Sequence, residues 1–99
     1  MKNSYSNIFS FNKKILKKSI KNLNNGNIVG LPTETVYGLG GNAYSKKSIL
    51  KIYKLKRRPK SNPLIVHYLN LKDASKDIIL NEKFKKLYKQ FCPGPITFI

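Results

Sequence analysis

The chain has 99 residues and a formal net charge of +16, with 20 Lys and Arg residues against 4 Asp and Glu. This length allows one ordinary domain and excludes a multidomain protein. Its apolar runs are far shorter than the roughly 20 residues of a membrane span and do not form a signal peptide, so we expect a cytoplasmic protein without a membrane partner. The single cysteine, Cys92, lacks a second Cys for a disulfide and a Cys/His cluster for a metal.

The excess positive charge has two interpretations. It suggests attraction to a polyanion such as RNA or a nucleotide. Lys, Asn and Ile are also the residues that an AT-rich coding sequence favours, so the charge can arise without a nucleic-acid partner. The composition leaves both interpretations open.

The first predicted element is a helix that begins after Ser10 or Asn12 and runs to about Asn24. Ile and Leu residues alternate with Lys at helical spacing, which predicts one apolar and one solvated face. Gly26 follows at a position typical of a helix C-terminus. The run "NIVGL", residues 27–31, predicts a buried strand because it is apolar on both faces.

Further helices and strands are predicted in the second half of the chain. Ser45 is the expected cap of a second helix that ends near Lys56, before Pro59. The remaining expected elements are the strand "PLIVHYL" (63–69), a helical segment (71–78), an amphipathic helix (81–91) and the start of a strand, "ITFI" (96–99). Alternating helices and short apolar strands predict an α/β fold. Because the sequence stops within an apolar run, we expect an N-terminal fragment of a longer protein.

Hydroxyl groups and glycines follow the first strand in "PTETVYGLGG". Thr33 and Thr35 stand where an α/β sheet binds ligands, at the carboxyl end of a strand. The same residues could instead only satisfy the backbone of a turn. Glu34 could pair with a nearby cation, Arg58 included. The stretch matches neither a dinucleotide fingerprint nor a P-loop.

A basic cluster ends the second helix in "KLKRRPKSNPLIVH", residues 54–67. Lys56 and Arg58 could bind phosphate or carboxylate oxygens, or they could only offset the negative end of the helix dipole. Asn62 lies in the following turn. His67 falls within an apolar strand pattern, which by itself favours a packed core residue over a ligand contact.

Three stretches in combination are more specific than any one of them. "GNIVGLPTETVYGLGGNA", "IYKLKRRPKSNPLIVH" and "FCPGPITFI" closely resemble the YrdC/Sua5 family of threonylcarbamoyl-AMP synthases, in the family's order and spacing. The resemblance predicts an N-terminal extension over residues 1–12 and the N-terminal part of a single YrdC-like domain over residues 13–99. The fold it implies is an α/β twisted open sheet flanked by helices, incomplete in this chain.

The resemblance implies a nucleotidyltransferase that makes threonylcarbamoyl-AMP from L-threonine, bicarbonate and ATP and releases pyrophosphate. A t6A transferase complex would then pass the threonylcarbamoyl group to tRNA. ATP is a substrate in this reaction, and Mg²⁺ is expected to accompany its phosphates, without a dedicated metal ligand in this chain. A weak affinity for tRNA or double-stranded RNA is a further expectation.

The resemblance also assigns roles to individual residues. Lys56 and Arg58 are the expected catalytic residues, and together with Asn62 they are expected to bind ATP. The expected threonine-binding residues are Thr35 and His67, with Thr33 and Tyr37 as secondary candidates.

The chain departs from the family pattern at two points. Arg57 stands where relatives often have a small residue. The family's second motif, S-x-N, lies beyond Ile99, so we expect the chain to be inactive by itself.

Two alternative functions differ from this enzyme. A non-catalytic basic RNA-binding module of the same fold would explain the charge, but the aromatic residues do not form a base-stacking platform. A related carbamoyl-transfer domain of hydrogenase maturation ranks lower, since no acylphosphatase-like or zinc-finger segment precedes the motifs.

Overall fold

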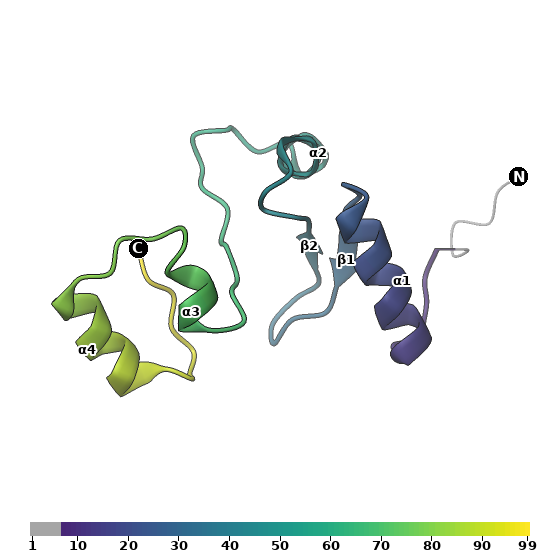
Figure 1. The fold of residues 1–99 in the computed structure, drawn as a ribbon. Helices are drawn as coiled ribbons and strands as arrows, with labels where there is room; N and C mark the ends of the chain where they lie inside the picture. Colours follow the sequence, from purple (N-terminus) through teal and green to yellow (C-terminus); the bar gives the residue numbers. More distant parts are fainter. Residues whose placement is uncertain (1–6) are drawn as a thin grey trace, which may run out of the picture. The chain divides into compact units, whose positions relative to one another are not determined.

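The computed structural model describes residues 7–99, so the first six residues of the expected N-terminal extension lie outside it. The chain divides into two compact units, Met1–Leu64 and Ile65–Ile99. The first contains α1, β1, β2 and α2, and the second contains α3 and α4 (Figure 1). The expected domain boundary between residues 12 and 13 stays a prediction. No helix among the described residues is long and apolar enough to cross a membrane.

Helix α1 spans Lys13–Asn24, as the sequence predicts. The Asn12 side chain accepts a hydrogen bond from the Ile15 amide at 2.9 Å, which satisfies one of the open donors at the helix N-terminus. The helix ends at Asn25, and Gly26 follows with a positive φ of 79°. Because glycine lacks a Cβ, it adopts this left-handed conformation at little cost.

A two-stranded antiparallel hairpin follows α1. Strand β1, Val29–Leu31, confirms the expected strand in part, and β2, Gly38–Gly40, pairs with it so that Gly30 faces Leu39. The sequence analysis missed β2 because two of its three residues are glycines, which are depleted in strands. The expectation of a covered strand is also wrong for the residues described, since Gly30 and Leu31 are exposed.

Helix α2 spans Lys46–Lys56, as expected, and Ser45 caps it by accepting the Ser48 amide hydrogen at 3.2 Å. Ser48 is fully buried, and its hydroxyl donates to the Gly26 carbonyl at 2.8 Å. Ile52 is 7% exposed. A Cβ atom at Gly41 would lie 3.2 Å from Ser48 Cβ, so only glycine lets the chain pass this closely over α2. These contacts attach α2 to the turn after α1 and to the residue after β2.

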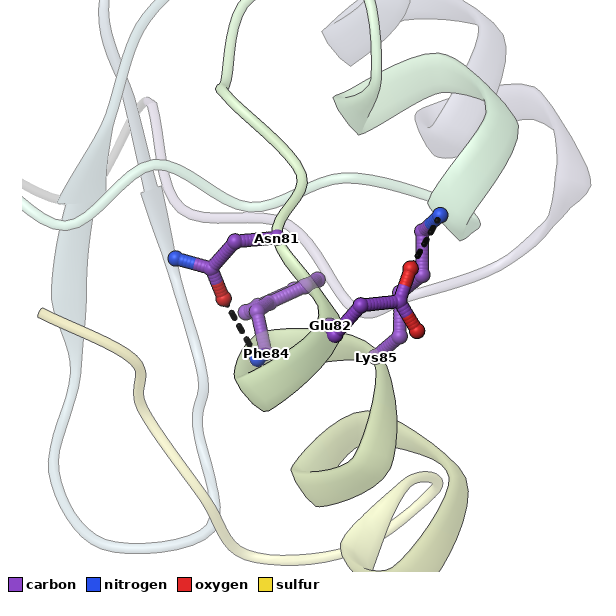
Figure 2. A network of polar contacts seen from close by, with 4 residues as sticks. All are labelled: Asn81, Glu82, Phe84 and Lys85. Atoms are coloured by element: carbon purple, nitrogen blue, oxygen red, sulfur yellow. Dashed lines mark hydrogen bonds and ion pairs between the residues drawn. The ribbon is translucent and has the colours of Figure 1, made fainter.

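The second unit contains two capped helices. Asn70 caps α3, Leu71–Ala74, by accepting the Asp73 amide hydrogen at 2.9 Å. This helix is shorter than the predicted segment, because the chain continues from residue 75 as turns. Helix α4 spans Glu82–Phe91 as predicted. Figure 2 shows its first turn, where Asn81 accepts the Phe84 amide hydrogen at 2.8 Å and Lys85 lies 3.4 Å from Glu82.

Two predicted strands are not formed, which corrects the sequence analysis. Residues 63–69 and 96–99 are neither helix nor strand in the structure. A strand needs a hydrogen-bonded neighbour, and no described segment pairs with either run. The final segment instead contacts α4, where the Phe98 ring meets Phe84 edge-on at 4.7 Å between centroids. The expected α/β class nevertheless holds, with helices around a small sheet.

Candidate functional site

The loop between β1 and β2, residues 32–37, is closed by its own hydroxyl groups. Thr33 Oγ1 accepts the Thr35 amide hydrogen at 3.3 Å and donates to the Val36 carbonyl. The Thr33 and Thr35 hydroxyl oxygens are 3.4 Å apart. A hydroxyl that bonds the backbone two and three residues ahead stabilises a tight turn. Thr33 therefore shapes the loop, while Thr35 keeps most of its hydrogen-bonding capacity for other groups.

The side chains of this loop are exposed. Tyr37 is 83% exposed, and Glu34 forms no ion pair with Arg58. Figure 1 shows the loop at the end of the hairpin remote from α2. No hydrogen bond among residues 7–99 joins the loop to the basic cluster after α2.

The chain leaves α2 through a turn held by hydrogen bonds, which we call the helix exit, residues 57–62. Arg57 adopts the left-handed conformation, with φ of 53°, and the Arg58 amide donates to the Tyr53 carbonyl at 3.1 Å. The Asn62 amide donates to the Pro59 carbonyl at 3.0 Å. The Tyr53 hydroxyl donates to the Asn62 carbonyl at 2.5 Å. The backbone of the basic motif is therefore bonded to α2 at both its start and its end.

A shallow hollow of about 410 Å³ lies against the helix exit. Two of its lining residues are apolar or aromatic and four are cationic: Leu50, Tyr53, Lys54, Arg57, Arg58 and Lys60. No acidic residue lines it, so the cations repel one another unless an anion lies between them. The hollow is suited to phosphate or carboxylate oxygens.

This hollow agrees only in part with the predicted ATP-binding residues. Arg58 lines it, whereas Lys56 and Asn62 do not. Sequence reasoning missed Lys54 and Lys60, although both lie in the basic stretch that flagged the site. The signal that could have found Lys54 is helical spacing, because residues four apart lie on one face, as Lys54 and Leu50 do.

His67 belongs to the second unit and is exposed. Its neighbour Tyr68 donates a hydrogen bond from its hydroxyl to Asp77 Oδ2 at 3.1 Å. Partial desolvation and the Asp77 carboxylate, which accepts this bond and repels a phenolate, raise the pKa of Tyr68 above its ordinary value. The bond links the segment that carries His67 to the turn after α3. That His67 joins Thr35 in one threonine-binding pocket stays a prediction.

Neither hollow of the first unit includes Thr33, Thr35 or Tyr37. The second hollow, about 360 Å³, lies between the segment before α1, α1 itself and β1. Beside it, the Lys18 ammonium lies 4.2 Å from the Phe9 ring centroid. Residues 7–99 contain no group of three or more His, Cys, Asp or Glu side chains that could hold a metal ion.

Comparison with known proteins assigns the chain to a family. The family model for Sua5, YciO and YrdC proteins, described as telomere recombination, matches residues 21–99, and the chain belongs to this family. A Bacillus subtilis threonylcarbamoyl-AMP synthase is 46% identical over 79 residues, which cover 78% of this chain and 22% of that protein. A Pyrococcus abyssi threonylcarbamoyl-AMP synthase is 43% identical over 77 residues, which cover 75% of this chain and 22% of that protein.

A third relative, from Methanocaldococcus jannaschii, is 35% identical over 103 residues. The match covers 100% of this chain but 50% of the relative, so the chain spans about half the length of this relative. No solved structure matches the chain. The residues that complete the relatives' folds are therefore not among those described for this chain.

Proposed function

We propose that the chain is part of a threonylcarbamoyl-AMP synthase of the cytoplasm. The enzyme would join L-threonine, bicarbonate and ATP into threonylcarbamoyl-AMP with release of pyrophosphate, for transfer to tRNA by a t6A transferase complex. The observation that carries the proposal is the cationic helix exit. It places four positive side chains around one hollow, in a chain of a family whose relatives are named for this product.

The helix exit supplies the groups that ATP requires. The Arg58 guanidinium offers a planar pair of donors to phosphate oxygens, and Lys56 offers a mobile positive charge. Charge develops on the α-phosphate and on pyrophosphate as the carbamate attacks, and fixed cations stabilise it. The Asn62 backbone is bonded to Tyr53 and Pro59, while its side-chain amide makes no hydrogen bond within residues 7–99 and can meet the nucleotide.

The hairpin loop supplies the groups that threonine requires. Thr35 and His67 would bind the amino acid, with Thr33 and Tyr37 beside them. Threonine is a zwitterion with a hydroxyl, so donors and acceptors of both kinds are needed. Thr33 acts chiefly by shaping the loop, because its hydroxyl already bonds the Thr35 amide. His67 must approach this loop for the pocket to close.

Mg²⁺ would arrive with ATP and screen the negative charge of its phosphates. The helix exit offers cations and no carboxylate, so its side chains fit the phosphate oxygens and not the metal. Because the chain spans half or less of the relatives reported above, we expect it to lack activity by itself.

The ATP role can be tested by titrating the isotope-labelled chain with Mg²⁺–ATP and following amide signals by NMR. We expect shifts at residues 54–62, and Arg58→Ala should weaken binding about 10- to 100-fold, the effect of removing a charged hydrogen bond. Lys46→Ala, on an exposed position at the other end of α2, is the control and should change affinity less than about 2-fold. Equal weakening by both variants would contradict the proposal.

A second candidate function is the basic RNA-binding module, which the net charge of +16 favours. That function predicts RNA binding that falls steeply with salt. Thr35→Ala and His67→Ala should not affect RNA binding, whereas they should abolish any response to L-threonine. A chain that binds RNA tightly but shows no ATP shifts at the helix exit would favour the module over the enzyme.

A further inference from the structure

The segment Ile65–Leu69, which we call the open segment, has an unusual combination of sequence and environment. It alternates along the chain, with Ile65, His67 and Leu69 on one side and Val66 and Tyr68 on the other. Ile65, Val66 and Leu69 are 67%, 49% and 90% exposed. Figure 1 shows the segment as coil between α2 and α3.

The backbone of the open segment is also unpaired. None of its amide or carbonyl groups forms a hydrogen bond within residues 7–99. Most buried backbone groups of native proteins are paired, and exposed ones can pair with an added strand. The open segment therefore has both the side chains and the free backbone groups of an inner strand.

The open segment lacks the features that protect a natural sheet edge. Exposed edges commonly carry Lys, Pro or a bulge that blocks further pairing. Between Leu64 and Leu69 there is no Lys, Arg, Asp, Glu or Pro, although the chain has 20 Lys and Arg residues among 99. A segment without such protection is suited to pairing on its backbone with another strand.

Two partners could supply that strand, and charge distinguishes them. A second copy would bring two chains of net charge +16 together, and like charges oppose this association. The other partner is the part of the family fold that this chain does not contain. The whole chain aligns with only 50% of the M. jannaschii relative, so the other half of that protein is a polypeptide without a counterpart among the described residues.

We propose that the open segment is a docking strand for the complementary half of the family fold, which adds a β-strand along Ile65–Leu69 and covers its apolar side chains. The partner is thus a polypeptide of this family with an exposed strand edge and apolar inward-facing residues. The inference rests on family membership and backbone geometry, and not on the proposed reaction.

The test is hydrogen exchange of the labelled chain with and without the unaligned part of the M. jannaschii relative, added as a separate polypeptide. Alone, amides 65–69 should exchange as in an unstructured peptide. With the added polypeptide, we expect them to slow by about 100-fold or more, as in a paired strand. The unaligned part of the B. subtilis synthase is the second probe, so that divergence of one partner does not decide the result.

Two matched variants localise the effect. Val66→Pro removes a backbone donor within the open segment and should abolish the protection. Ile79→Pro makes the same kind of change at a residue 94% exposed in the same unit, outside the segment, and should leave the protection intact. Circular dichroism should show that both variants keep helix α4.

Three results would overturn the proposal. The first is no slowing at amides 65–69 with either probe. The second is slowing that Val66→Pro leaves unchanged. The third is slowing that appears in the chain alone as its concentration rises, which would assign the strand to pairing between copies. Because the readout is exchange and not catalysis, failure here would leave the proposed synthase function standing, and loss of ATP binding would leave this inference standing.

Discussion

The loop between β1 and β2 and the helix exit carry two parts of the predicted site, and they hold their polar groups in different ways. In the loop, the Thr33 hydroxyl is used on neighbouring backbone groups, and the side chains around it are exposed. At the helix exit, the backbone forms the hydrogen bonds, and Arg58 is left with other cations around a hollow. The helix exit is thus prepared for an anion by the first unit alone, whereas the loop needs further residues around it.

The largest expected effect concerns the attachment of α2, on which the helix exit depends. Gly41→Ala should lower the free energy of unfolding by about 1–3 kcal/mol, because the added Cβ would lie 3.2 Å from Ser48 Cβ and 3.3 Å from Ile52 Cδ1. Denaturant unfolding measures the change. The matched control is Gly30→Ala, where nothing lies within 4 Å of the added Cβ, and a similar loss there would refute the packing argument.

A smaller effect is expected in the loop. Thr33→Val keeps the shape of the side chain but removes its hydroxyl, and should lower stability by about 0.5–1.5 kcal/mol, with faster hydrogen exchange at the Thr35 amide. Thr35→Val removes only the 3.4 Å contact between hydroxyls, so its effect should be smaller. If Thr35→Val proved the more damaging, Thr33 would not be the residue that shapes the loop.

A gain in stability is expected at Arg57. Its left-handed backbone is strained for a residue with a Cβ, so Arg57→Gly should raise the free energy of unfolding by about 0.5–1 kcal/mol. Arg57→Ala removes the same charge but keeps the strain, and should give no such gain. Thermal unfolding of both variants separates conformation from charge, and equal stabilisation by both would assign the effect to charge repulsion.

The smallest expected effect is the pH dependence of the bond beside His67. Because the pKa of Tyr68 is raised in the folded state, the stabilisation it gives should be complete below the pKa of an unfolded tyrosine, about 10, and should be lost as pH rises through the higher folded-state pKa. Titration of labelled tyrosines by NMR measures this pKa. Asp77→Asn should lower it, and an unchanged pKa would contradict the assigned cause.

Much of the local structure could be predicted from the sequence. The caps Asn12 and Ser45, the end of α1 near Gly26 and the helix before Phe91 were all found, because each depends on hydrogen bonds or periodicity within a few residues. The strand β2 and the state of residues 63–69 were not, because strand formation depends on a neighbour that local sequence does not specify.

The candidate site divides in the same way. The basic motif showed that cations gather after α2, since charge and helical spacing are local properties. Which of them face one hollow depended on the left-handed turn at Arg57 and on the bond between Tyr53 and Asn62. Lys54 and Lys60 therefore line the hollow, while Lys56, central to the motif, does not.

The sequence by itself determined the helices, their caps, the excess of positive charge and the family. Only the tertiary structure decided that Gly38–Gly40 pairs with β1, that Ser48 and Gly41 attach α2, and that Ile65–Leu69 is unpaired. The physical reason is the range of the interactions. Helix caps and periodicity join residues a few positions apart, whereas strand pairing and close packing join residues that only the folded chain brings together.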